Sequence, residues 1–453
     1  MKMKILIVGG GGREHSLIWA ISQNPRCQEI FCAPGNAGIN TIAKQVTLNI
    51  MKPAEVVAFS KKNCIDFVII GPEAPLIVGL SDALKKEGIL TFGPSKASSR
   101  LEASKSFTKE ICNLGNIPTA ASETFYTLED AQNHLKGCNL PIVIKADGLA
   151  AGKGVVIAES NDTALDAVQT IFDGKFSTAK DPIVIEEFLE GEELSYFAVT
   201  DGKTLLPIGS AQDHKRAFDG DKGPNTGGMG AYSPAPLLTN ELEEKIISKI
   251  IKPTLTVMTE KNLPFVGVLY AGLMIKNGNP KLIEYNVRFG DPECQVLMVR
   301  LGGQILDILL DCAEGKLDQS KINWANDSAI SVVMASKGYP GEYNKGTAIR
   351  NISIAEKIDG VEVFHAGTKD NNGEVVANGG RVLSITCREQ TLELARKKVY
   401  KAISLIDWSD GFQLNTFLSN LQEIYKNTSR GMIKKNKKTK NKKRAKKRRK
   451  KTK

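Results

Sequence analysis

The stretch PIVIKADGLAAGKGVVIA (141–158) places two apolar, β-branched runs on either side of a glycine-rich turn. Such runs favour β-strands, and their close spacing predicts a hairpin flap with a glycine-rich tip. A P-loop is excluded, because Asp147 and Gly154 stand where that motif needs Gly and Ser or Thr, and no helix follows. A flap of this kind can fold over a triphosphate. Lys145 favours that reading over an ordinary surface hairpin, because an ammonium on an apolar strand needs an anionic partner.

Upstream of this hairpin, the first hundred residues alternate strand-like and helical signals. The strand-like runs end in Gly or Pro: KILIVGG (4–10), EIFCAPG (29–35), DFVIIGPE (66–73) and ILTFGPS (89–95). This pattern predicts an open parallel sheet with a ligand crevice at the carboxyl ends of its strands. The run Gly9–Gly12 follows a strand and opens a helix, where backbone N–H groups can bind phosphate. It does not fit the dinucleotide fingerprint, so a phosphate or phosphosugar site and a plain tight turn both stay open.

Downstream, PIVIEEFLEGEELSYFAVT (182–200) has a second strand–turn–strand pattern, and residues 211–236 form a long polar, glycine-rich loop. A loop of that length inside a compact domain is usually functional. KLIEYNVRFGDPE (281–293) is expected to be a strand, on which Glu284 and Asn286 share one side. A carboxylate beside an amide oxygen suits Mg²⁺ or Mn²⁺, and Arg288, continuing that face, could hold a phosphoryl oxygen or carboxylate. The alternative is a solvated polar strand face.

Composition limits the class of protein. The net charge of +11 comes from residues 431–453, whose 15 Lys or Arg residues leave the remaining chain at −4. A nucleic-acid-binding interpretation would therefore depend on this tail, which is expected to be disordered. The 8 cysteines form no CxxC pair, which argues against structural zinc and favours free thiols in a reducing, cytoplasmic setting. An apolar run long enough to span a membrane is not expected, and the start MKMKILIVGG is interpreted as a strand.

Several motifs occur in an order that resembles the phosphoribosylamine–glycine ligase family from residue 3 to about residue 413. They are GGGGREHSL, GPEAPL, GPS with EASKSFTK, KADGLAAGKGV, EEFLEGEELS, DHKR, NTGGMGAYSPAP and EYNVRFGDPECQ. The resemblance implies a multidomain α/β and α+β fold with a two-lobed ATP-grasp core. The expected parts are an N-terminal substrate-binding parallel-sheet domain (1–101), an ATP-grasp domain (102–325) with a flap subdomain (about 121–192), a small α+β closing domain (326–425) and a disordered basic tail (426–453).

The resemblance also implies site residues, all of them for ATP, the metal or the substrates. Lys105 and Lys145 would contact the ATP phosphates, and the loop Gly148–Gly154, with Gly152 and Lys153, would be the flap. Glu186 and the backbone of Leu189 would meet adenine, and Glu192 or Glu193 the ribose. Glu284 and Asn286 would hold Mg²⁺ or Mn²⁺, and Lys145 and Arg288 would be catalytic. The substrate contacts would come from Gly10, Gly11, Gly12, Glu73, Asp213, Lys215, Arg216, Gly228, Arg288 and Asp291.

The implied reaction ligates glycine to 5-phosphoribosylamine through glycyl phosphate and yields glycinamide ribonucleotide, ADP and phosphate. A monomer is expected. The main rivals are another ATP-grasp ligase and an ATP-binding protein that has lost catalysis.

The sequence departs from the family after DGFQ (410–413). The family's aromatic-Arg-Asp-Ile-Gly ending is absent, and LNTFLSNLQEIYKN stands in its place, followed by the basic tail. Two explanations stay open: a reading-frame shift near Gln413, or a genuine basic appendage that binds acidic partners nonspecifically. Either one predicts an altered last strand in the closing domain.

Overall fold

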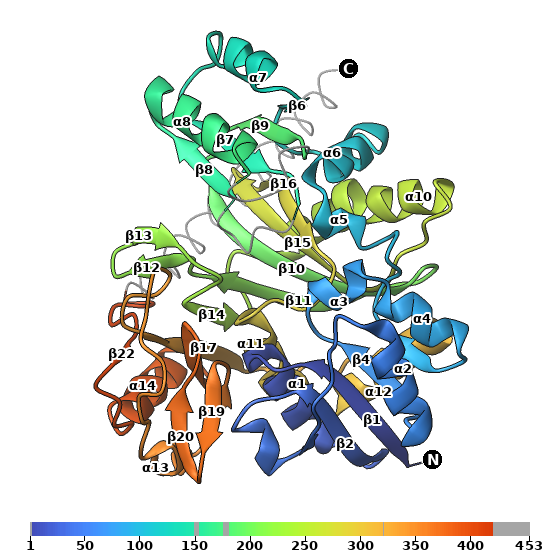
Figure 1. Ribbon diagram of the computed structural model, residues 1–453, viewed down its shortest axis with the longest axis vertical. Coiled ribbons are helices and arrows are strands. Elements are labelled where there is room, and N and C mark those ends of the chain that lie inside the picture. The colour runs from blue at the N-terminus through green and yellow to red at the C-terminus, as the bar shows by residue number, and fades with distance from the viewer. Residues whose placement is uncertain (1, 149–153, 175–180, 320, 420–453) are drawn as a thin grey trace, which may run out of the picture.

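The computed structural model describes residues 2–148, 154–174, 181–319 and 321–419. In Figure 1 the N-terminal and C-terminal domains lie at the bottom and a smaller lobe lies at the top. A long central sheet lies between them. Of the helices in the described ranges, none is long and apolar enough to span a bilayer.

The N-terminal domain is a five-stranded sheet with the order β3-β2-β1-β4-β5, and every neighbouring pair is parallel. The predicted open parallel sheet is therefore confirmed. Its strands are β1 (Met3–Gly9), β2 (Cys27–Pro34), β3 (Lys44–Gln45), β4 (Phe67–Ile70) and β5 (Leu90–Phe92). Its helices are α1 (Gly12–Ser22), η1 (Ile39–Thr41), α2 (Pro53–Lys62), α3 (Glu73–Ile77) and α4 (Leu80–Lys86). The side chains of β4 are buried throughout, as a strand covered on both faces requires.

Two helices lead from this domain to the upper lobe, α5 (Arg100–Ala103) and α6 (Lys105–Leu114). The break lies at Ser104, whose extended backbone and side-chain hydroxyl, accepting from the Phe107 N–H at 3.1 Å, cap α6.

The upper lobe is a four-stranded antiparallel sheet with the order β6-β9-β7-β8. Its strands are β6 (Ser122–Phe125), β7 (Ile142–Ala146), β8 (Val155–Ala158) and β9 (Ile183–Glu187), and α7 (Leu128–Leu135) and α8 (Asn161–Phe172) pack on it. β7 and β8 pair from Ile142↔Ala158 to Lys145↔Val155, so the predicted hairpin is present. Its tip, with Gly152 and Lys153, lies outside the described residues.

The central sheet has the order β16-β15-β10-β11-β14-β17-β21-β18, with β22 added beside β17. Its strands are β10 (Glu192–Asp201), β11 (Leu205–Asp213), β14 (Gly230–Ser233), β15 (Val266–Lys276), β16 (Asn279–Asn286), β17 (Ser328–Ser336), β18 (Val361–His365), β21 (Arg381–Glu389) and β22 (Gly411–Phe412). Two small hairpins adjoin it, β12 (Arg216–Phe218) with β13 (Lys222–Asn225), and β19 (Thr368–Asn371) with β20 (Glu374–Ala377). The sheet thus runs from the ATP-grasp region into the C-terminal domain.

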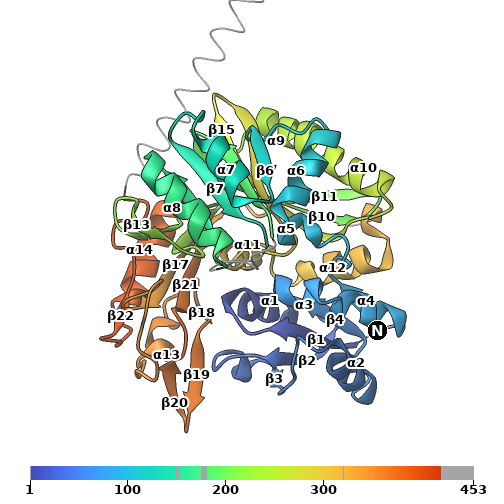
Figure 2. The same cartoon turned by 45° about the horizontal axis from the view of Figure 1, so that its top comes forward.

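Helices cover this sheet. Figure 2 shows α9, η2 and α10 on the upper side, and α11 and α12 between the sheet and the N-terminal domain. Their bounds are α9 (Asn240–Ile246), η2 (Ile247–Ile251, a π-helical turn), α10 (Lys252–Glu260), α11 (Glu293–Leu301), α12 (Gln304–Glu314), η3 (Leu317–Gln319), α13 (Ile352–Ala355) and α14 (Leu392–Ile403). Every residue of α11 is buried, because the helix contacts α1 on one side and β14, β17 and β21 on the other.

Three sequence interpretations need correction. The stretch 211–236 is not one long loop: β11 extends to Asp213, and the β12–β13 hairpin and β14 follow. The two strands within 182–200 do not pair, because β9 belongs to the upper sheet and β10 to the central one. The strand predicted over 281–293 ends at Asn286, so Arg288 lies in a bend and does not continue the face of Glu284.

Candidate active site

Glu284 and Asn286 lie at the end of β16, where register with β15 pairs them with Gly272 and Tyr270. Two residues apart on a strand, they face the same side. Within the described part of the chain, neither side chain makes a hydrogen bond or ion pair. Burial opposes ionisation of Glu284, but the ammonium groups of Lys215, Lys145 and Lys105 lower its pKa. The result is an ionised carboxylate that lacks a direct protein partner and lies in a cationic field.

This donor set fits a divalent metal bound jointly with phosphate. Carboxylate and amide oxygens are hard ligands suited to Mg²⁺ or Mn²⁺. In the described ranges, three or more Asp, Glu, His or Cys side chains do not come together as a metal cage. Two protein oxygens alone would leave most of an octahedral shell to phosphate and water, which is the usual arrangement for Mg²⁺ in nucleotide sites.

Lys145 has the anionic partner that its apolar strand predicts. Its Nζ contacts Glu186 Oε1, and the other oxygen of Glu186 lies 2.6 Å from Lys109 Nζ. All three side chains are buried. Lys145 Nζ also donates to the carbonyl of Ile283, the residue before Glu284, at 3.4 Å. The upper sheet is thereby tied to β16 beside the metal-ligand pair. Sequence reasoning missed Lys109, although its place within the SFTK motif was the available signal.

Lys105 begins α6 and reaches the start of the flap. Its Nζ donates to the carbonyl of Gly148 at 3.0 Å, and its backbone N–H contacts Asp147. Asp147 also accepts from the hydroxyls of Ser104 and Ser106, at 3.0 and 2.6 Å. Burial lowers the pKa of Lys105, while Glu284 and Asp147 counteract that effect. Asp147 therefore joins the first turn of α6 to the flap, a role that the sequence analysis did not assign.

Lys215 links the DHKR segment to β10. Its Nζ lies 2.8 Å from Glu193 Oε2. Burial would lower the pKa of Lys215, but Glu193 and Asp213 raise it well above its ordinary value. Glu192 and Glu193 are neighbours on β10 and so point to opposite faces. Glu193 therefore lies on the side of Lys215, and Leu189 lies in the segment that joins β9 to β10.

Asp213 is the buried acid of the same segment. Its Oδ1 is buried and has no hydrogen-bond partner among the described residues. Burial, together with the neighbouring carboxylate of Glu293, raises its pKa well above the ordinary value. Glu293 Oε1 accepts from the hydroxyls of Tyr270 and Ser195 at 2.7 and 3.3 Å. Two acids thus lie close together, and within the described ranges one oxygen of Asp213 has no hydrogen-bond partner.

Arg288 lies between two carboxylates that the N-terminal half of the chain supplies. Its Nη2 lies 2.8 Å from Glu102 Oε1 and its Nε lies 3.2 Å from Glu73 Oε2. Burial raises the pKa of Glu102, and Arg288 opposes that rise. Burial also opposes ionisation of Glu73, but Arg288 and Arg13 lower its pKa. Glu102 was not predicted as a site residue.

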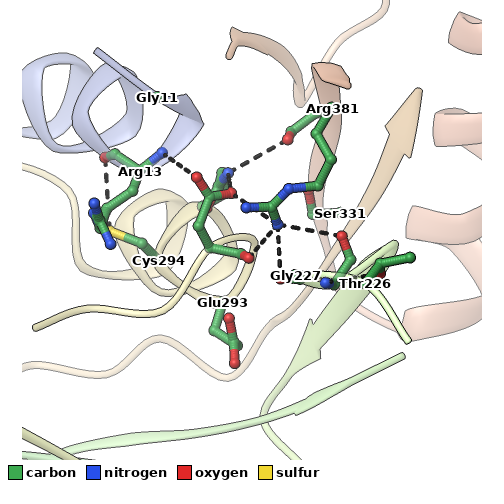
Figure 3. A network of polar contacts seen from close by, with 12 residues as sticks. Gly11, Arg13, Thr226, Gly227, Glu293, Cys294, Ser331 and Arg381 are labelled. Atoms are coloured by element: carbon green, nitrogen blue, oxygen red, sulfur yellow. Dashed lines mark hydrogen bonds and ion pairs between the residues drawn. The ribbon is translucent and has the colours of Figure 1, made fainter. Parts of the chain in front are cut away.

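A polar network joins the glycine turn of α1 to the C-terminal domain around Asp291 (Figure 3). The Arg13 N–H donates to Asp291 Oδ2 at 3.4 Å, and Arg381 Nη1 lies 3.7 Å from Asp291 Oδ1. Arg381 Nη1 also donates to the carbonyls of Gly227 and Gly228, at 2.7 and 3.3 Å. Burial opposes ionisation of Asp291, yet Arg381 and Arg13 lower its pKa. Sequence reasoning did not single out Arg381.

At Gly10, Gly12 and Gly228 neighbouring atoms lie too close to leave room for a side chain. A Cβ at Gly10 would lie 2.6 Å from the Gly35 carbonyl, and one at Gly12 would lie 2.6 Å from Gln295 Nε2. Gly228 has φ +110°, and its Cβ would lie 2.5 Å from Pro292 Cδ. The Gly11 N–H already donates to Glu14 Oε2 at 2.7 Å. The backbone therefore comes close to the site where the N-terminal domain meets the ATP-grasp domain and where the ATP-grasp domain meets the C-terminal domain.

The structure gathers several of the predicted residues around β16. Lys105, Lys145, Glu186, Glu193, Lys215, Glu284 and Arg288 are linked by the contacts and charges described above. Arg216 is separate, since its Nη1 donates to Gly223 within its own hairpin at 2.8 Å.

Comparison with known proteins identifies the family. Three family models match in sequence: phosphoribosylglycinamide synthetase N domain over 3–102, its ATP-grasp (A) domain over 103–294 and its C domain over 329–413. The phosphoribosylamine–glycine ligase of Brucella melitensis is 50% identical over 410 residues, covering 90% of this chain and 96% of the relative. The chloroplastic ligase of Arabidopsis thaliana is 51% identical over 408 residues, covering 88% and 77%.

Solved structures agree. The phosphoribosylamine–glycine ligase of Thermotoga maritima superposes with a TM-score of 0.80 at 32% identity and covers 91% of this chain and 99% of that one. A biotin carboxylase from Campylobacter jejuni shares the fold alone, with a TM-score of 0.68 at 14% identity over 91% and 93% of the two chains. With its three matched domains in order and relatives half identical over nine-tenths of its length, the chain belongs to the phosphoribosylamine–glycine ligase family of ATP-grasp enzymes.

Proposed function

We propose that this protein couples ATP hydrolysis to the ligation of glycine with 5-phosphoribosylamine, giving glycinamide ribonucleotide, ADP and phosphate. The observation that carries the proposal is the pair Glu284 and Asn286, whose side chains have no hydrogen-bond or ion-pair partner among the described residues and lie in the field of Lys105, Lys145 and Lys215. Such a site is built for a metal-bound polyphosphate, because phosphoryl transfer depends on positioning and charge neutralisation more than on an acid–base pair.

The residue roles follow from this charge pattern. Glu284 and Asn286 would hold Mg²⁺ or Mn²⁺, which would neutralise the phosphate oxygens when bound. Lys105 and Lys145 would contact the phosphates from the upper lobe, and the flap with Gly148, Gly152, Lys153 and Gly154 would exclude water. Adenine would lie against Glu186 and the backbone of Leu189. Glu192 or Glu193 would meet the ribose hydroxyls: Glu193 lies on the side of Lys215, with which it pairs, whereas Glu192 points to the opposite face of β10.

The two substrates would enter from different domains. Glycine carries an ammonium and a carboxylate. Among the described residues Asp213 Oδ1 has no hydrogen-bond partner, so it could accept from the ammonium, and the Lys215 ammonium could pair with the carboxylate. Gly228 lies against the Asp291 carbonyl, and these two residues would complete the substrate contacts. The phosphate of phosphoribosylamine would approach the turn Gly10–Gly12, with Glu73 near its sugar. The contacts of Arg216 within its own hairpin give it the weakest claim among the substrate residues.

The reaction then proceeds in two balanced steps. The glycine carboxylate attacks the γ-phosphorus of ATP and ADP leaves, which gives glycyl phosphate. The amine of phosphoribosylamine attacks the acyl carbon, loses a proton and displaces phosphate. Arg288 would steady the charge that develops on the transferred phosphoryl group. Its two carboxylate partners fix the guanidinium plane in advance, as preorganised charge stabilisation requires.

ADP release tests the proposal. Purified protein receives Mg-ATP, glycine and freshly generated phosphoribosylamine, and each component is omitted in turn. ADP formation that needs all three supports the ligase, whereas ATP binding without turnover in a folded sample would contradict it. Repeating the assay with Mn²⁺ decides the preferred metal. A monomer in the cytoplasm remains our expectation, which light scattering and cell fractionation test.

A further inference from the structure

The family's C-domain match ends at residue 413, yet the chain continues as an ordered segment to Ser419. We call residues 414–419 the C-terminal clamp. Leu414, Phe417 and Leu418 are buried in the core of the C-terminal domain. Arg396 Nε on α14 donates to the Phe417 carbonyl at 2.7 Å. The clamp is therefore attached to this domain by apolar burial and by a hydrogen bond to its main helix.

The clamp also binds the turn of the β12–β13 hairpin. Asp219 Oδ1 accepts from the backbone N–H groups of Asn415 and Thr416, both at 2.9 Å, and from the Thr416 hydroxyl at 2.8 Å. Burial opposes ionisation of Asp219, but its contacts with Thr416 and Asn415 lower its pKa. In Figure 1 the hairpin and β22 are neighbours on the same side of the molecule. The Phe218 and Phe412 rings, 6.2 Å apart, bring the same two segments together.

A second contact reaches the two ends of the chain that carries the hairpin, at His214 before it and Gly230 after it. The Phe417 ring lies 5.9 Å from the His214 ring, and a Cβ at Gly230 would lie 3.0 Å from Phe417. The His214 N–H donates to the Gly230 carbonyl at 2.9 Å. The carbonyl of Lys215 accepts from both the N–H and the hydroxyl of Thr226 at 2.8 Å. The clamp therefore contacts the chain at His214 and at Asp219, on both sides of Lys215.

We propose that the C-terminal clamp positions Asp213 and Lys215 for the substrate, with Asp219 as the positioning residue that connects them. A carboxylate that accepts four hydrogen bonds from a different segment fixes the far end of the hairpin, and Phe417 fixes its base. Lys215 is thereby held at Glu193, next to Glu284, before substrate arrives. Residues 414–419, which follow the family's C-domain match, thus act on the active site. They also complete the hydrophobic core of the C-terminal domain.

The inference rests on the proposed placement of glycine at Asp213 and Lys215, and one set of variants separates the two claims. Asp219→Ala removes the acceptor and leaves the buried clamp residues in place. Asp219→Asn keeps one oxygen acceptor. Asp370→Ala is the matched control, because Asp370 accepts from Gly373 at 3.0 Å in another hairpin turn, β19–β20. A chain ending at Ser419 removes only residues 420–453.

We expect Asp219→Ala to raise the KM for glycine about tenfold while ATP affinity and the melting temperature stay close to wild type, since small displacements of positioning groups are costly. Asp219→Asn should recover most of this loss, and Asp370→Ala and the chain ending at Ser419 should behave as wild type. An unchanged KM for glycine in folded Asp219→Ala would refute the clamp.

Two further variants keep both claims testable. Thr416→Val removes one donor to Asp219 and should raise the KM for glycine in the same direction; no change would refute the clamp even if Asp219→Ala does not fold. Lys215→Ala tests the glycine placement alone. If Lys215→Ala keeps a normal KM for glycine, the placement fails, whatever Asp219 does.

Discussion

Replacement of Arg288 by methionine removes a guanidinium from between two carboxylates. Glu102 is 8% exposed and would retain the Val287 N–H at 2.8 Å, whereas Glu73 is 28% exposed and keeps Arg13 nearby. Breaking a buried ion pair from one side costs about 3–5 kcal/mol. Because only Glu102 becomes isolated, we expect a loss of about 3 kcal/mol, which lowers the melting temperature of a chain of 453 residues by about 3 °C.

The same variant should lose turnover for a separate reason. Removal of one preorganised charge stabiliser costs about 10²–10³ in kcat. Adding Glu102→Gln removes the isolated charge, so the double variant should regain most of the stability while its kcat stays low. Thermal unfolding and steady-state kinetics measure the two effects independently.

Arg300→Met is the control. It removes another buried guanidinium, which lies 3.4 Å from Asp327 and stacks on Trp324 away from the site, so it should lose stability and keep kcat. Near-normal kcat in Arg288→Met would refute the catalytic role. If the double variant were no more stable than Arg288→Met, the account of the ion pair would be wrong.

The stability of Arg288→Met should also depend on pH. Burial already raises the pKa of Glu102, and removal of the guanidinium removes a group that opposed the rise. The folded state then binds more protons than the unfolded state above the unfolded pKa of about 4.3, so stability falls as pH rises through the folded value. The stability deficit of the variant relative to wild type should therefore become smaller as the pH falls toward the unfolded pKa of about 4.3.

Three further results are expected. Glu284→Gln should lower kcat by about 10²–10³ and weaken the dependence on Mg²⁺ without changing the melting temperature, and normal kinetics in the folded variant would exclude a metal-binding role. Lys145→Ala should also lower turnover by orders of magnitude; an unaltered rate would remove the lysine from phosphate binding. Burial and His365 lower the pKa of His15 to about 3. The free energy of unfolding should therefore fall as pH drops below about 6.5, and denaturant titrations of His15→Gln should show a flatter decline.

The sequence alone was informative where local pattern and tertiary structure agree. The apolar runs ending in Gly or Pro predicted the parallel sheet, and the glycine-rich turn at 141–158 predicted the β7–β8 hairpin. Strand alternation placed Glu284 beside Asn286. Each of these features depends on the hydrophobic periodicity or on the turn-forming residues of a stretch of about 20 residues.

The sequence analysis was wrong or silent on features that depend on residues far apart in the sequence. The stretch 211–236 lacks apolar alternation, and its short strands exist because β11, β14 and β17 pair with one another across the sheet. The partner of Arg288, Glu102, lies 186 positions away. The role of Lys109 likewise becomes apparent only from its ion pair with Glu186, which lies on a different element. Spacing within one segment carries no information about such pairs.

The end of the C-terminal domain shows packing that the sequence analysis did not predict. An altered last strand was expected beyond Gln413; in the structure β22 is two residues long and pairs with β17 at Ala335 and Ser336. Leu414 and Phe417 nevertheless complete the C-terminal core. The apolar residues of LNTFLSNL were the available signal for this packing.

The pairing of β14 with β17 has a consequence for how the protein can be divided. β14 (Gly230–Ser233) pairs with β11 at Ala231 and Tyr232 on one edge and with β17 along all four residues on the other, so backbone ladders cross the junction between the ATP-grasp and C-terminal domains. A fragment that ends before β17 would leave an open strand edge, which invites intermolecular pairing. Truncation, domain exchange or insertion of a fusion partner near residue 326 would therefore disrupt this sheet. The change in sequence character at that position would otherwise suggest a linker between domains.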